Sequence, residues 1–266
     1  MKEMMLILKA EFNRHWIQMK RYPFEPVANV VTLFILFMII VSGFRPLQNS
    51  TGVGNFNRTV AGAIIGYVMW FFVVMALSNF SNKLEEEAKL GTLEQLCMAS
   101  KSLILVISGR LVTDFFYNLF VIAVLFLLLM LSTGVTLSLS AWLLVPLCVT
   151  VLGLYGFGFV IGSLSLLFKR IGEVRSIIQI VFLFLAIAPL DSVSPPIRAA
   201  AVFLPLTQGI DVMRSIAVDS QPFFDPMILQ RLLLVALNSF VYLIIGIFIF
   251  RAAERSAFKR GLLAHY

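Results

Sequence analysis

Residues 141–168 read AWLLVPLCVTVLGLYGFGFVIGSLSLLF and carry no charged side chain. At a rise of about 1.5 Å per residue, a helix of this length is longer than the roughly 30 Å of hydrocarbon in a bilayer. Such a helix has no polar face to present to water, so it does not suit the surface of a soluble domain. The stretch therefore predicts a helix that crosses a membrane.

Five further apolar stretches have a similar character, and together the six predict an all-α integral membrane protein. The expected transmembrane helices are residues 27–44, 60–80, 103–132, 141–168, 176–190 and 229–250. The composition agrees, because only 13% of the residues are charged, where a soluble domain has about 25%. We expect residues 1–266 to form a single transmembrane domain.

The distribution of Lys and Arg predicts the orientation of these helices. Six crossings place both termini on one side of the membrane, together with the loops at 81–101 and 169–175 and the tail at 251–266. Fifteen of the 21 Lys and Arg residues lie on that side, and five lie in the opposite loops. By the positive-inside rule, both termini are cytoplasmic and the protein is integral to the cell membrane. The net charge of +7 is then a topology signal, and nucleic acid is not an expected partner.

The N-terminal segment 1–24 precedes the first crossing and has a different pattern. Its apolar side chains recur at spacings of three and four residues, at Met5, Leu8, Phe12, Trp16 and Met19. This pattern predicts an amphipathic helix at the cytoplasmic membrane interface, and a helix packed on protein is the alternative. The charged start lacks the apolar core of a cleavable signal, so we expect it to remain in the mature protein.

Residues 191–218 are too apolar for a solvated loop and too interrupted for a complete crossing. The interruptions are Pro195, Pro196, Pro205 and Gly209. Two half-helices that enter the outer leaflet and return would reconcile these facts, because irregular backbone at membrane depth needs cover from protein or a cavity. Such an outer re-entrant hairpin between the fifth and sixth crossings also explains why 176–190 is short. A surface loop with amphipathic helices is the alternative.

Two charged residues, Arg110 and Asp114, lie four residues apart on one face of the third expected crossing. Charges inside a membrane are costly, so an intramembrane pair would indicate function. A helix over 103–132 would, however, be about 45 Å long and could project its first turns into the cytoplasm. An interfacial ion pair without a transport role is therefore the alternative.

The fourth expected crossing contains Gly158 and Gly162, which form a G-x-x-x-G pattern. Without side chains at these two positions, a neighbouring helix can approach closely. The pattern predicts a helix-packing site rather than a ligand site.

The sequence contains no recognisable catalytic set. His15 and His265 lie near opposite termini, and Cys97 and Cys148 have no partner at a metal-ligand spacing. No Ser/His/Asp pattern and no Walker phosphate-binding motif occurs. We therefore expect no catalytic residue, no metal site and no cofactor bound by this chain, and active transport would draw its energy from a partner.

The cytoplasmic loop 82–100 contains LEEEAKLGTLEQLCMAS, the densest group of carboxylates in the chain. Residues 85–89 favour a helix and Gly91 interrupts it. Thr92 followed by Gln95 matches a capping box, which begins a second short helix. The loop presents both carboxylates and apolar side chains, as docking into a groove of another protein requires. A solvated connector is the alternative.

The pattern E-x-x-x-G-T-L-E-Q-L, from Glu87 to Leu96, resembles the loop between the second and third crossings in transmembrane subunits of the ABC-2 family of ABC exporters, also called type V. The order of elements is similar to that family over nearly the whole chain, from the interface helix through six crossings with an outer re-entrant hairpin. One departure is the stretch from Cys97 to Ser100, where relatives often have a Pro.

The resemblance implies that the loop is a coupling helix seated in a separate ATP-binding subunit. It also implies that two such subunits, which bind ATP and Mg, work with two permease chains. The implied coupling residues are Glu86, Glu87, Gly91, Thr92, Leu93, Glu94, Gln95 and Leu96. We therefore expect the permease subunit of an ATP-driven exporter, not itself an enzyme, for an amphipathic, lipid-linked or drug-like substrate.

Two other classes of function remain open at this point. An ion-driven secondary transporter would need ionisable groups near the middle of the membrane, and Arg110 and Asp114 are the candidates. A non-transporting membrane protein would use the loop 82–100 as a simple docking site.

Overall fold

The computed structural model describes residues 17, 21–22, 24–51, 53–89, 103–168, 171–188 and 195–259. Within these residues every regular element is helical, which confirms the all-α prediction. In chain order the elements are α2 (Phe24–Thr51), α3 (Val53–Lys89), α5 (Leu103–Thr133), the 3-10 turn η1 (Ala141–Leu143), α6 (Leu144–Leu167), α7 (Gly172–Ile187), α8 (Pro195–Val202), α9 (Pro205–Ala217) and α10 (Pro226–Lys259).

Five of these helices are long and apolar enough to cross a membrane. Their apolar stretches are Pro26–Gly43, Phe56–Ser78, Val112–Thr133, Ala141–Leu167 and Pro226–Ala257. These five coincide with the expected first, second, third, fourth and sixth crossings. The expected fifth crossing, 176–190, corresponds to α7, which has 16 residues and a length of about 24 Å. Alone, α7 is shorter than the hydrocarbon thickness of a bilayer.

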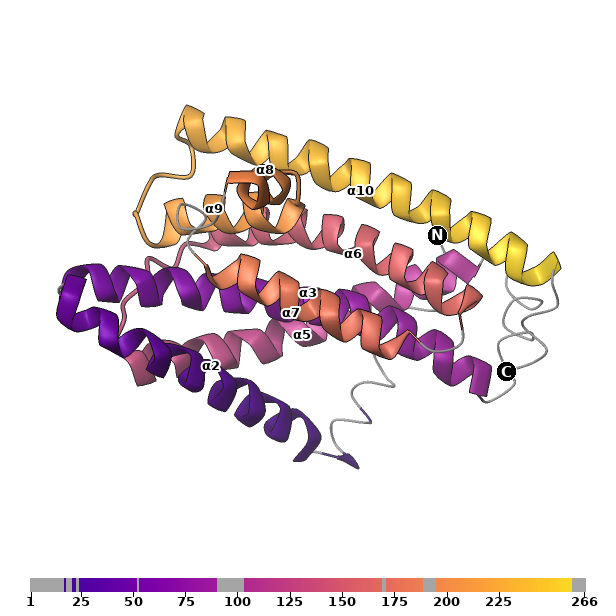
Figure 1. The fold of residues 1–266 in the computed structure, drawn as a ribbon, viewed down its shortest axis with the longest axis horizontal. Coiled ribbons are helices and arrows are strands. Elements are labelled where there is room, and N and C mark those ends of the chain that lie inside the picture. Colours follow the sequence, from indigo (N-terminus) through magenta and orange to yellow (C-terminus); the bar gives the residue numbers. More distant parts are fainter. Residues whose placement is uncertain are drawn as a thin grey trace.

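The long helices lie side by side and alternate in direction along the bundle. Figure 1 shows α3, α6 and α10 running one way, while α5 and α7 run the opposite way. As a result, the end of α3 at Lys89 and the start of α5 at Leu103 lie toward the same end of the bundle. The starts of α3, α6 and α10 lie toward the other end. We call these the Lys89 end and the Val53 end.

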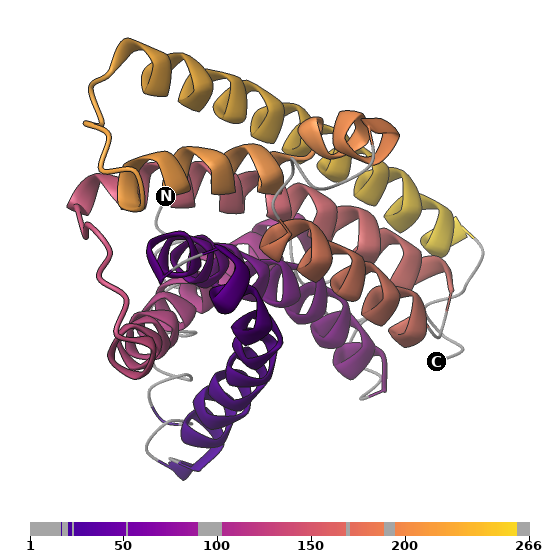
Figure 2. The ribbon, with the colours of Figure 1, turned by 60° about the vertical axis from the view of Figure 1, so that its left-hand side comes forward.

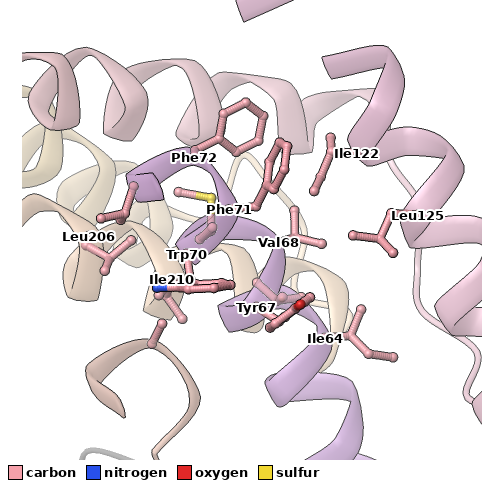
Figure 3. Packing of buried hydrophobic residues seen from close by; sticks show 14 of the residues in the cluster. Ile64, Tyr67, Val68, Trp70, Phe71, Phe72, Ile122, Leu125, Leu206 and Ile210 are labelled. Atoms are coloured by element: carbon pink, nitrogen blue, oxygen red, sulfur yellow. The ribbon is translucent and has the colours of Figure 1, made fainter. Parts of the chain in front are cut away.

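Helix α3 forms the centre of the bundle. It packs against α2, α5, α6, α7 and α9, and 83% of its apolar stretch is buried. Figure 3 shows its large side chains directed at different neighbours, among them Tyr67, Phe71 and Phe72, which are almost fully buried. Burying an aromatic or branched side chain stabilises by about 1.5–3 kcal/mol in water, whereas between helices in lipid the close packing itself supplies the attraction.

Helices α6 and α10 approach each other through glycines. A Cβ on Gly156 would lie 2.5 Å from the backbone of Tyr242, and a Cβ on Gly246 would lie 2.2 Å from the carbonyl oxygen of Gly156. Both distances are shorter than any side chain tolerates, so only glycine allows the two backbones to meet here. This packing fixes α10 along α6 for much of its length.

The segment between α7 and α10 contains two short helices, α8 and α9, which lie beside α6 and α10 (Figures 1 and 2). Pro205 begins α9, where its fixed φ suits the first helical turn and its missing N–H costs nothing. At the corner between the helices, the Thr207 hydroxyl donates to the carbonyl oxygens of Ala201 and Leu204. The prolines that interrupt the sequence therefore start helices in this segment.

Candidate functional site

Two of the expected coupling residues, Glu86 and Glu87, lie at the Lys89 end of the bundle. Helix α3 continues past its apolar stretch through Glu86 and Glu87 to Lys89, so the first part of the loop 82–100 is helical. The other expected coupling residues, Gly91, Thr92, Leu93, Glu94, Gln95 and Leu96, lie outside the described residues. The chain thus leaves the described bundle on its central helix and re-enters it on α5.

Arg110 and Asp114 both lie on α5, near the start of its apolar stretch at Val112. The carboxylate of Asp114 is buried and acts electrostatically on Tyr155 of α6. One turn later, the Asn118 amide donates to the backbone oxygen of Asp114 over 2.7 Å. Asp114 therefore lies within electrostatic reach of α6, at the edge of the apolar stretch rather than at its middle. The side chain of Arg110 lies outside the described set.

Gly158 and Gly162 of α6 are both buried. A Cβ on Gly158 would lie 2.6 Å from the carbonyl oxygen of Ala76 in α3. Gly158 is thus a point of close approach between α6 and the central helix.

A polar junction that the sequence did not reveal joins α3, α7 and α9. From α9, Arg214 extends its side chain to two backbone carbonyls. Its Nε atom donates to the oxygen of Gly62 in α3 over 3.1 Å. Its Nη2 atom donates to the oxygen of Ala186 in α7 over 2.8 Å. One guanidinium thereby joins three helices.

The acceptor on α7 is a helix terminus. The last carbonyls of a helix have no partner within it and carry partial negative charge, so a cation satisfies them and interacts well with the helix dipole. Ala186 lies in the last turn of α7, which ends at Ile187. Arg214 therefore caps α7 from outside the helix.

The guanidinium of Arg214 remains a cation in this position. Burial lowers its pKa, and the Asp211 carboxylate one turn earlier on α9 raises it. The guanidinium group of Arg is not deprotonated in proteins, and the two accepting carbonyl oxygens favour its charged form. In the sequence, the site is visible only as a single Arg within LTQGIDVMRSIA. The distribution of Lys and Arg assigned this residue to an outer loop and gave it no further role.

A second contact joins α9 to α3 nearby. Arg58 of α3 forms an ion pair with Asp219, which follows α9, with 2.6 Å between nitrogen and oxygen. The Arg58 side chain is 69% exposed, so the pair contributes little by itself.

Helix α9 also contacts the other half of the bundle. Gly209 lies directly against Thr150 of α6. From α10, the Asn238 amide donates to the carbonyl oxygen of Phe203 over 2.7 Å, just before α9. Helix α9 thus lies between α3 on one side and the packed pair α6 and α10 on the other.

An aromatic group marks the Val53 end near the start of α10. Trp142 of η1 stacks on Phe223 with 4.9 Å between ring centroids and meets Phe224 edge-on at 5.1 Å. Trp142 and Phe224 are exposed, and such aromatic side chains are typical of the boundary between lipid and water.

Among the described residues, no group of His, Cys, Asp or Glu is arranged to hold a metal ion.

These features define an all-helical integral membrane protein whose described residues offer packing and polar contacts between helices. The model of the ABC-2 family transporter protein matches residues 7–248, which is most of the chain. The chain therefore belongs to the ABC-2 family, whose members are membrane components of ABC transporters. A search of curated proteins returned no match.

Proposed function

We propose that this chain is the permease subunit of an ATP-driven exporter and that a separate subunit hydrolyses ATP. The observation that carries the proposal is the family match over residues 7–248. The position of α3 supports it, because this central helix ends at Lys89, directly before most of the expected coupling residues in the sequence. A push or pull on that loop would act directly on the middle of the bundle.

In the proposed topology α7 is a sixth crossing. The helix is too short to span the bilayer alone, and neighbouring helices cover its end. The end of α7 lies against α3 and is capped by Arg214, so the carbonyl oxygen of Ala186 needs no water. Helices α8 and α9 then form the outer re-entrant hairpin. Both termini are cytoplasmic, and the segment 1–24 is the interface helix.

The proposed coupling site comprises Glu86, Glu87 and the residues from Gly91 to Leu96. Carboxylates would orient the loop on the ATP-binding subunit, and leucines would anchor it in a groove. Two ATP-binding subunits, carrying ATP and Mg, would act on two permease chains. When the ATP-binding subunits close, the loops would shift the central helices.

The proposed substrate is amphipathic, lipid-linked or drug-like, taken from the cytoplasm or the inner leaflet. Exposed apolar side chains occur on α2, α5, α7 and α10, for example at Ile39, Phe116, Phe184 and Phe248. These surfaces suit lipid or a second permease chain. They favour a substrate that travels partly in contact with apolar side chains.

A secondary transporter is a weaker proposal. Asp114 lies near the start of an apolar stretch, whereas an ion-driven site is expected near the middle of the membrane.

The decisive experiment is purification of the chain with its ATP-binding subunit, followed by transport in liposomes with and without ATP. We expect the double substitution Glu94→Ala and Leu96→Ala to release the subunit or to reduce ATP-driven transport about tenfold or more, because it removes an anchor and an orienting charge. The matched control is Glu173→Ala, which removes an exposed carboxylate in the first turn of α7.

The control variant should retain both the subunit and transport. Normal co-purification and normal transport by the double variant would contradict the proposed coupling site. Transport that is independent of any ATP-binding subunit would contradict the exporter itself.

A further inference from the structure

Helix α3 connects the two ends of the molecule without interruption. It runs from Val53 to Lys89, and the part from Gly62 to Lys89 is about 40 Å long at about 1.5 Å per residue. Residues 67–89 contain neither Pro nor Gly, the usual causes of a sharp kink. A displacement at the Lys89 end therefore reaches the Val53 end as a movement of the whole rod.

One face of this rod carries three contacts to the α7–α9 region. Arg58, Gly62 and Gly66 follow one another at intervals of four residues and so lie in one line along the helix. Arg58 pairs with Asp219. Gly62 accepts from Arg214, and a Cβ on Gly66 would lie 1.9 Å from the carbonyl oxygen of Ala186.

The two sides of α9 differ in the kind of contact they make. Toward α3 and α7, α9 uses the charged donor Arg214, whose planar fork reaches two carbonyls at once. Toward α10, the hydrogen bonds come from the neutral amide of Asn238, which donates to the Phe203 carbonyl oxygen over 2.7 Å and to Gln208 Oε1 over 3.4 Å. Hydrogen bonds from ionised donors are roughly twice as strong as neutral ones, so each hydrogen bond from Arg214 is stronger than one from Asn238.

We propose that Arg214 is the positioning residue that makes α9 and the end of α7 move with α3 during the transport cycle. Helices α6 and α10 are fixed to each other through Gly156 and Gly246, so a change in the distance between α9 and α10 reports a movement of α9 relative to that pair. The outer hairpin is thereby driven by the loop at the opposite end of the molecule. This inference rests on the proposed function.

The test uses the chain in complex with its ATP-binding subunit in lipid nanodiscs, with Cys97 and Cys148 replaced by Ser. Spin labels are placed in pairs at exposed positions: Asn57 on α3 with Gln221 after α9, and Gln221 with Ile244 on α10. Distances between the labels are measured without nucleotide and after trapping with ATP and vanadate. No substrate is needed.

In the wild-type complex we expect the distance between Asn57 and Gln221 to stay constant on trapping, and the distance between Gln221 and Ile244 to change. In Arg214→Leu the pattern should reverse, because α9 then stays with α10. Arg214→Lys, which keeps the charge but loses the fork, should give an intermediate result. The control Arg231→Leu removes an exposed Arg of α10 and should behave as wild type.

Two results would overturn the inference alone: a wild-type distance between Asn57 and Gln221 that changes on trapping, or Arg214→Leu distances identical to wild type. Failure of any ATP-binding subunit to co-purify with the wild-type chain would overturn the proposed function and this inference with it. Hydrogen exchange in the nucleotide-free chain distinguishes the loss of this contact from a general folding defect. If only the contact is lost, Arg214→Leu should leave the protection of α5 and α6 unchanged.

Discussion

At the scale of single residues, glycine decides where helices touch. Gly43 and Gly66 lie on neighbouring helices, α2 and α3, yet their surroundings differ completely. A Cβ on Gly66 would lie 1.9 Å from the Ala186 carbonyl oxygen, whereas a Cβ on Gly43 would meet nothing within 4 Å. A glycine in the sequence therefore carries no single meaning, and the neighbouring backbone determines its role.

We expect Gly66→Ala to destabilise the protein by about 1–3 kcal/mol, because the new methyl group forces the end of α7 away from α3. The melting temperature of the purified protein should fall by about 2 °C or more. Gly43→Ala is the matched control and should leave the melting temperature unchanged or slightly higher, since Ala is the better helix former. Equal behaviour of the two variants would show that the close approach of α7 is not as described.

At the scale of elements, α7 is a short helix held by side chains of α3. The Trp70 indole donates to the backbone oxygen of Gln179 over 2.7 Å. The Gln179 amide in turn donates to the Ser78 hydroxyl over 2.8 Å. With Arg214 at its end, α7 is tied at two levels, which compensates for its limited length.

A double-mutant cycle should measure this tie. Gln179→Leu and Ser78→Ala should each cost about 1 kcal/mol, because each leaves a partly buried partner unsatisfied. The double variant should cost clearly less than the two together, since it removes both partners. Ser176→Ala is the control, because that hydroxyl donates only within α7, to Gly172. Simple additivity of the free energies of unfolding would contradict a direct contact between α3 and α7.

At the scale of the whole molecule, the number of crossings determines on which side of the membrane each loop and each terminus lies. Five described helices have the length of a crossing, and the role of α7 decides whether the two ends of the chain share a side. Cytoplasmic termini and an outer hairpin require that α7 crosses.

Single cysteines in a background without Cys97 and Cys148 should establish the topology in intact cells. We expect a cysteine at Gln221 to react with a membrane-impermeant maleimide, because it would lie outside. Cysteines at Glu173 and Ser256 should react only after the cells are permeabilised. Protection of Gln221 together with Glu173, with Ser256 labelled from outside, would indicate five crossings.

Much of the architecture was accessible from the sequence, because lipid imposes a simple rule. A long uncharged stretch such as 141–168 must form a helix with all its backbone groups bonded internally, and that helix is present. The prolines in 191–218 likewise predicted two short helices. Arg214 was missed as a junction, because its partners are the backbone carbonyls of Gly62 and Ala186. Every residue has such a carbonyl, so the sequence does not indicate which ones accept a hydrogen bond.

The sequence by itself determined that this is an all-α membrane protein and, through the motif beginning at Glu87, indicated its family. Both follow from local chemistry, namely apolar length and a short recognisable loop. Only the tertiary structure decided that α3 is the central helix, and that Arg214 joins it to α7 and α9. In a bundle of apolar helices many faces are chemically alike, so the choice of neighbours depends on how closely backbones approach, which only the packed molecule defines.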